Sequence, residues 1–289
     1  MDLFQKGRTN FNTTTPRVIS PRGAFSNIKN ILTGDNTGVQ MVLLVVIVVA
    51  LLGVLYMVKN SIKSYYNKKA SSPYIVKGTK KAKNSLVVTQ DPSDSNSITL
   101  YRSDGEEGIE FSYSLWMLIE NLEYNYGDWK HVFHKGNKSS YPNRAPGVWI
   151  HPRENKLRVY MNTYEDILEY IDIDNIPVKK WIHLAIILTS GHIHPDDPTS
   201  KMAHYLDVYF NGKLRKRHVF KTLPRQNYGN LWVNLFGGFE GYLSKFRYFN
   251  YALDYENVEK IVKEGPSQGA CGETGELPPY LENSWWFDI

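Results

Sequence analysis

The sequence has little cysteine and no acidic cluster of the kind that catalysis commonly uses. Cys271 is the single cysteine in 289 residues, so an intrachain disulfide is excluded. Secreted domains of this size often carry disulfides, and the absence favours a reducing compartment. The sequence also lacks the H-E-x-x-H motif of zinc proteases and the glycine-rich loop that binds phosphates.

Charge is absent from residues 39–58, VQMVLLVVIVVALLGVLYMV. As a helix this run rises about 30 Å, which is the thickness of the hydrocarbon core of a bilayer. A buried helix of a soluble protein is rarely apolar on every face for this length. A cleaved signal peptide has a shorter apolar core nearer the N-terminus. The run therefore predicts a retained transmembrane helix.

Basic residues are distributed unevenly around this run. Only Arg22 and Lys29 lie close before it, whereas eight lysines follow: Lys59, Lys63, Lys68, Lys69, Lys77, Lys80, Lys81 and Lys83. Basic residues stay on the cytoplasmic side during insertion, so we expect the C-terminal part to face the cytosol. The same lysines suit anionic lipid headgroups. The lipid bilayer is the first expected partner.

The remaining sequence divides by composition. Residues 1–38 predict a disordered arm, and residues 59–95 predict a polar, basic linker. Residues 96–265 predict the folded domain. Residues 266–289 form a tail whose Trp285, Trp286 and Phe287 we expect to dock on that domain, because these side chains are unfavourable to expose.

The domain has the alternation of β-strands. Apolar and polar residues alternate over 109–117, 157–161 and 206–210, and residues 181–188 are apolar on both faces. Asn211-Gly212 predicts a tight hairpin turn. One short helix is expected after Asp254, its N-cap, and before Gly265. Many strands joined by short turns predict an all-β fold, a two-sheet antiparallel sandwich.

The order of several segments resembles a known family. These are FSYSLWM, HVFHKGN, KLRVYMN, VKKWIHLAIIL, LDVYFNGKLRKR and LFGGFEGYLSKFRYFNYAL. They resemble the laminin-G-like branch of the concanavalin A-like lectin/glucanase superfamily, which implies a jelly-roll sandwich. With its anchor, the whole chain looks like membrane proteins of large nucleocytoplasmic DNA viruses. That resemblance implies a virion internal membrane, with capsid or other membrane proteins as partners.

Glucanases of this superfamily carry carboxylates on one strand face as E-x-D-x-E. The nearest match here is Asp172 and Asp174, which no glutamate pair brackets. Glycosidases need two carboxylates flanking the bond. We therefore interpret these acids as solvent-facing and expect no enzyme.

Four residues of the loop GHIHPDDP have metal-binding side chains: His192, His194, Asp196 and Asp197. They are the candidate metal ligands, although the prolines and polar neighbours favour an ordinary exposed loop, because metal sites usually need ligands fixed on scaffold elements. The family resemblance adds calcium as an open alternative, because laminin-G-like domains often bind it through acidic loops. No other cofactor is expected.

A basic hairpin is the candidate binding surface. It consists of Lys213, Arg215, Lys216 and Arg217, with charges on both strand faces. Such an arm suits phosphate, sulfate or acidic protein. The equally weighted alternative is an edge strand whose charges prevent aggregation. The aromatic residues follow the strand periodicity, so nucleic acid is not an expected partner.

These observations lead to three functional hypotheses. The first is a membrane-anchored, non-enzymatic interaction protein, associated with a virion membrane or capsid. The second is a lectin that binds glycan on the concave sheet. The third is a glycoside hydrolase. Exposed aromatic side chains with convergent polar groups on one sheet face would favour binding.

Overall fold

The computed structural model describes residues 37–94, 97–103, 105, 108–194, 196–197 and 199–269. The chain divides into two compact units, Met1–Ser64 and Tyr65–Ile289. Most of the expected N-terminal arm and of the C-terminal tail, with Cys271, Trp285, Trp286 and Phe287, lies outside the described residues.

The first described element is helix α2, Thr37–Ser71. Its stretch Thr37–Tyr65 is long and apolar enough to cross a membrane. Large apolar side chains along it are exposed, for example Met41 at 72% and Leu55 at 62%. Since exposed apolar surface of this extent is unfavourable in water, the helix is compatible with a single-pass membrane anchor.

Within the described residues, twelve strands form two six-stranded sheets, and every strand pair is antiparallel. Sheet A has the order β1 (Tyr74–Lys81), β12 (Glu240–Phe249), β3 (Phe111–Asn121), β8 (Trp181–His192), β9 (Met202–Phe210) and β10 (Lys213–Val219). Sheet B has the order β2 (Leu86–Val88), β11 (Asn230–Val233), β4 (Lys130–Gly136), β5 (Arg144–Ile150), β6 (Lys156–Tyr160) and β7 (Tyr170–Asp174).

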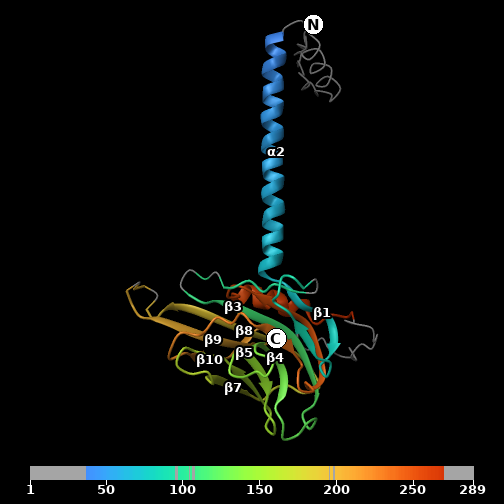
Figure 1. The fold of residues 1–289 in the computed structure, drawn as a ribbon, viewed down its shortest axis with the longest axis vertical. Coiled ribbons are helices and arrows are strands. Elements are labelled where there is room, and N and C mark those ends of the chain that lie inside the picture. The colour runs from blue at the N-terminus through green and yellow to red at the C-terminus, as the bar shows by residue number, and fades with distance from the viewer. Residues whose placement is uncertain are drawn as a thin grey trace, which may run out of the picture. The chain divides into compact units, whose positions relative to one another are not determined.

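The two sheets pack face to face around one apolar core (Figure 1). Leu115 and Ile186 of sheet A belong to the same buried cluster as Phe133 and Val159 of sheet B. The ring centroids of Tyr113 and Phe133 are 5.1 Å apart across the interface. The expected two-sheet antiparallel sandwich is confirmed.

The hairpin and the helix also form where the sequence predicts them. Asn211 and Gly212 join β9 to β10 with positive φ angles of 48° and 79°. Helix α3, Tyr255–Glu264, begins after Asp254, whose side chain accepts a hydrogen bond from the Asn257 amide. Its Val258 packs with Ala185 and Ile187 of β8, so α3 covers part of the outer face of sheet A.

The range expected to be a basic linker differs from that expectation, because it contains β1 and β2. β1 pairs with β12 and β2 pairs with β11, so each lies at the edge of a sheet. Ile75, Val76 and Val88 are buried in the core. An edge strand needs few apolar side chains and tolerates lysines. The lysines of this segment therefore led to the prediction of a linker, although they are compatible with edge strands.

Candidate functional site

The outer face of sheet B carries an unusual set of side chains. Alternation directs Leu157 and Val159 of β6 into the core, which leaves Arg158 and Tyr160 outward. The pairing of β4, β5, β6 and β7 then aligns one cross-strand row, His131, Trp149, Arg158 and Asp172. This face therefore combines aromatic, imidazole and guanidinium groups.

A neighbouring cross-strand row contains a glycine where a side chain would otherwise stand. Gly147 of β5 lies opposite His134 of β4 and Tyr160 of β6. A Cβ added at Gly147 would approach the Arg144 Cδ to 3.2 Å. The missing side chain thus leaves room for Arg144 to lie over the sheet.

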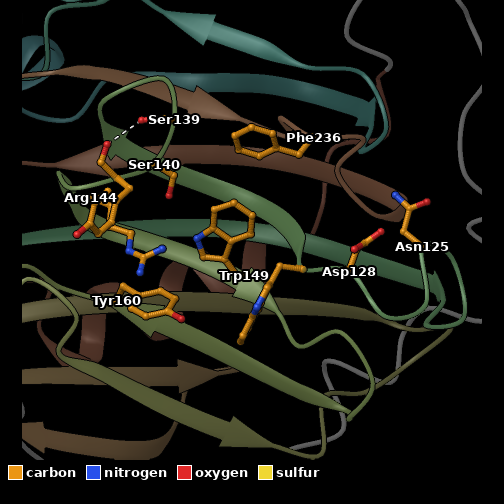
Figure 2. A pocket seen from close by; sticks show the side chains of 10 residues that line it. Asn125, Asp128, Ser139, Ser140, Arg144, Trp149, Tyr160 and Phe236 are labelled. Carbon is orange, nitrogen blue, oxygen red and sulfur yellow. Dashed lines mark hydrogen bonds between the residues drawn. The ribbon is translucent and has the colours of Figure 1, made fainter.

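A pocket of about 470 Å³ lies at this position (Figure 2). Its volume is in the range of small-molecule sites. The lining comes from the outer face of sheet B and from the loops at its edges: Asn125, Asp128, Trp129, Ser139, Ser140, Tyr141, Arg144, Trp149, Tyr160 and Phe236.

Aromatic side chains form much of the pocket wall. Trp149 is 7% exposed, and its ring stacks on Phe236 with centroids 5.8 Å apart and planes 19° apart. Tyr141 and Phe236 remain 58% and 55% exposed. Trp129 and Tyr160 meet edge to face at 6.4 Å. Such a wall can pack against the apolar face of a ring-shaped ligand.

Three polar atoms of the wall have no hydrogen-bond partner within the described structure: Ser140 Oγ, Arg144 Nε and Trp149 Nε1. Buried polar groups are nearly always hydrogen-bonded, so three such atoms in one wall are a marked exception. The Arg144 guanidinium lies 3.6 Å from the Tyr160 ring centroid, in cation-π contact. In Figure 2, Trp149 lies between Arg144 and the exposed Asp128.

Two buried histidines hold the loops that carry this wall. The Leu235 amide donates to His131 Nδ1 at 2.9 Å, and the rings of His131 and His134 are hydrogen-bonded at 2.7 Å between Nε2 and Nδ1. His134 Nε2 then lies 2.7 Å from the Asn137 carbonyl. If both rings carry their proton on Nε2, every contact joins one donor to one acceptor.

Burial keeps this pair neutral. Desolvation lowers the pKa of His134 to about 4, and it lowers the pKa of His131 well below 6.5. A proton added to His131 Nδ1 would face the Leu235 N–H, so the chain of hydrogen bonds requires neutral rings. The pair therefore connects the loop before Phe236 with the loop that bears Ser140.

Asn162 and Gly136 also hold the loop of residues 137–143, which bears Ser140. The buried Asn162 side chain accepts from the Arg144 amide and donates to the Pro142 carbonyl at 3.0 Å. Gly136 has φ +146°, and a Cβ there would lie 2.0 Å from the Asn143 carbonyl oxygen. Both contacts preorganise the loop of residues 137–143, which reduces the ordering required on binding.

The carboxylates considered for hydrolysis are engaged in ion pairs. Asp172 accepts two hydrogen bonds of 2.6 Å from Arg158, whose pKa these bonds raise. Asp174 lies 3.6 Å from the Lys156 ammonium. Asp172 thus has a structural partner, consistent with its interpretation as a solvent-facing acid.

The structure does not bring the four candidate metal ligands together. His192 Nδ1 lies 2.8 Å from the Ser200 carbonyl, and the Asp197 carboxylate accepts from the Thr199 amide and hydroxyl at 2.9 and 2.6 Å. Among the described residues, no three His, Cys, Asp or Glu side chains form a group that could hold a metal. Calcium binding stays a prediction.

The candidate basic hairpin is the edge strand β10, and its charges differ in their contacts. Arg217 donates to both oxygens of Asp207, at 2.7 and 2.6 Å. Lys216 donates to the Asp172 carbonyl at 2.9 Å. A bulge between Leu214 and Lys216 interrupts the alternation assumed from the sequence. Lys213 and Arg215 are exposed.

Sequence reasoning missed the pocket, although it named a sheet face as a binding surface. Its residues are scattered over two strands, β5 and β6, and three loops, and the outward direction of the strand residues depends on the register. Trp149 in particular reads as a core residue in a strand of apolar neighbours. A usable signal was the pair of histidines His131 and His134, which are polar residues within a buried strand.

Residues 265–269 match the G-x-S-x-G pattern of serine hydrolases. In those enzymes the serine lies on a turn from a strand into a helix. Here the pattern follows the C-terminus of α3, and the Ser267 amide donates to Ser244 Oγ at 2.8 Å. The local structure is therefore unlike a nucleophile elbow.

Comparison with known proteins gives one family match. A laminin-G family model of the concanavalin A-like lectin/glucanase superfamily matches residues 91–259. Among proteins of curated function, none matches the sequence.

Several solved structures are similar at low identity. The receptor-binding domain of botulinum neurotoxin mosaic serotype C/D is 13% identical, with TM-score 0.41, over 54% of this chain and 36% of that one. The serotype D ligand-binding domain in complex with N-acetylneuraminic acid is 12% identical, with TM-score 0.44, over 67% and 46%. The serotype D binding domain is 13% identical, with TM-score 0.43, over 68% and 51%. The chain thus spans about half or less of each.

Proposed function

The chain belongs to the laminin-G-like branch of the concanavalin A-like lectin/glucanase superfamily, and we propose that it is a membrane-anchored, non-enzymatic protein that binds carbohydrate. The pocket on the outer face of sheet B supports this proposal most strongly. It combines exposed aromatic side chains with convergent polar groups, which is the composition of a ligand site.

The chemistry of the wall suits a sugar ring. Tyr141 and Phe236 offer flat apolar surface for the C–H face of a pyranose, and Ser140, Asn125 and Asp128 offer hydrogen-bonding groups for its hydroxyls. The loop of residues 137–143 is held by buried contacts, so little conformational entropy is lost on binding.

The same pocket argues against hydrolysis. Glycosidases of the common mechanism need two carboxylates, and the described lining contains one, Asp128. Asp172 of β7 lies outside this lining and is held by Arg158. A single exposed carboxylate can orient a hydroxyl but cannot act both as acid and as nucleophile.

The apolar helix supplies the membrane anchor, and the lysines after it support a cytosol-facing domain. Protease added to sealed microsomes is then expected to digest the sandwich and to spare the N-terminal arm. Protection of the sandwich would contradict the cytosol-facing orientation. A virion membrane or capsid-associated role, with capsid or membrane proteins as partners, is part of the proposal and rests on the resemblance of the layout.

A glycan array tests the binding function. The full chain is incorporated in nanodiscs of zwitterionic lipid, so that its lysines find no anionic surface, and is applied to the array. Bound glycans are expected, and Tyr141→Ala or Phe236→Ala should weaken their binding, since both side chains are more than half exposed in the pocket.

Tyr255→Ala is the matched control, because Tyr255 is 65% exposed on α3 and lies outside the pocket lining. Equal loss in the control and the pocket variants would show that the aromatic wall is not the binding surface. No glycan retained by the parent chain would refute carbohydrate binding.

A further inference from the structure

The arginines on the outer face of sheet B differ in their partners. Arg158 is neutralised by two hydrogen bonds to Asp172. Arg144 has no ion pair with any carboxylate of the described residues, and its Nε is buried without a partner. Its guanidinium instead lies over the ring of Tyr160. As far as the described residues show, Arg144 is therefore a cation of the pocket wall that no carboxylate compensates.

Uncompensated charge in a half-buried site is unfavourable unless a partner of opposite sign arrives. Desolvation lowers the pKa of Arg144, which shows the direction of this penalty. Beside it, Ser140 and Trp149 are 3% and 7% exposed, and each has an unpaired polar atom at the wall. Two neutral donors and one cation meet there, which is the complement of an oxyanion.

We infer that the pocket recognises an acidic saccharide, one bearing a carboxylate or a sulfate, through the guanidinium of Arg144. This inference rests on the proposed carbohydrate binding and adds the class of sugar. The anionic group is held at the Arg144 end. The exposed Asp128 lies on the other side of Trp149, where it repels the anion and accepts hydrogen bonds from sugar hydroxyls (Figure 2).

The structure also contains a residue that positions Arg144. Gly147 leaves the space in which the Arg144 side chain lies, and a Cβ there would approach three of its carbon atoms to between 3.2 and 3.5 Å. Gly147→Ala keeps the positive charge of Arg144 but displaces its side chain. This variant therefore tests whether the position of the guanidinium, and not only its charge, is required for binding.

The test uses the full chain in nanodiscs of zwitterionic lipid and sets of three glycans: a neutral sugar, its carboxylated form and its sulfated form. The parent chain is expected to prefer one or both acidic forms. Arg144→Gln should weaken the acidic form about 10- to 100-fold, which corresponds to the loss of one charged hydrogen-bonded contact, and should weaken the neutral form by a clearly smaller factor, so that the preference is lost.

Gly147→Ala should weaken the acidic form in the same direction, and it replaces Arg144→Gln if that variant fails to fold. Arg215→Gln is the matched control, since it removes an exposed arginine charge from sheet A. It is expected to keep the preference.

Three results would overturn the inference. They are equal binding of neutral and acidic forms by the parent, a preference that survives Arg144→Gln and Gly147→Ala, and a preference that Arg215→Gln abolishes. In the first case carbohydrate binding itself still stands. Retention of no glycan in any set refutes both the inference and the proposed function.

Discussion

Mild acid is expected to destabilise the sandwich through histidines that are buried without charge. His134 and His183 have pKa values lowered to about 4 and about 3, in both cases by desolvation, and desolvation also lowers the pKa of His131. In an unfolded chain a histidine has a pKa near 6.5. Between these values the unfolded state binds more protons, so the free energy of unfolding falls as the pH falls.

The magnitude follows from the size of the shift. At pH 5.5 an unfolded histidine is about 90% protonated and the buried one is neutral, which destabilises the fold by about 1.4 kcal/mol for each group. His134 and His183 together lower the free energy of unfolding by about 3 kcal/mol, and His131 adds a further loss of the same sign. Domains are stable by about 5–15 kcal/mol, so the effect is large.

Urea unfolding followed by tryptophan fluorescence at pH 7.5 and pH 5.5 measures this loss. The window lies above the usual pKa of carboxylates, so histidines dominate it. His134→Gln should lose about 1.4 kcal/mol less between the two pH values, whatever its stability at pH 7.5. Equal stability of the parent chain at both pH values would refute the buried, neutral hydrogen-bond chain.

Three further predictions concern stability. Gly136→Ala should lower the free energy of unfolding by about 2 kcal/mol or more, because its Cβ would lie 2.0 Å from a carbonyl oxygen. Gly127→Ala, at φ +94° with no atom near its Cβ, should lower it by about 1 kcal/mol. Urea titrations measure both changes. Arg217→Ser should lower the free energy of unfolding by about 1–2 kcal/mol, because it leaves the buried carboxylate of Asp207 unpaired. Arg215→Ser should change it by no more than about 0.5 kcal/mol. Equal effects of the two variants would contradict the contacts of β10. A chain that begins at residue 72 should fold, whereas one that begins at residue 96 lacks β1 and β2 and should aggregate in size-exclusion chromatography.

The strands β1 and β2 could not be predicted from the sequence, whereas the central strands could. Alternation located β3, β8, β9 and β12, since each buries one or both faces and shows period two or a continuous apolar run. β1 is held by few apolar side chains and by backbone pairing with β12. Pairing partners are distant in sequence, so composition alone assigned this segment to a linker.

The site was less accessible to prediction for the same reason. The uncompensated charge of Arg144 depends on which arginine the register places beside a carboxylate: Arg158 lies opposite Asp172, whereas Arg144 lies opposite Gly136. The loop GHIHPDDP, by contrast, has metal-binding side chains close in sequence, yet two of them, His192 and Asp197, contact local backbone and hydroxyl groups instead. Closeness in sequence was a poor guide to a metal site, whereas cross-strand pairing decided which arginine lacks a carboxylate partner.

The most direct test of the account is fluorine NMR of the full chain labelled with 5-fluorotryptophan, titrated with the glycan that binds best on the array. The seven tryptophans give separate probes, assigned by Trp→Phe variants. Trp129 and Trp149 line the pocket, whereas Trp116 and Trp181 lie in a separate buried cluster on sheet A. Saturable shifts of the first two signals, with the other two unchanged, are predicted. Shifts confined to Trp116 and Trp181, or no shift at all, would contradict carbohydrate binding at the sheet B pocket.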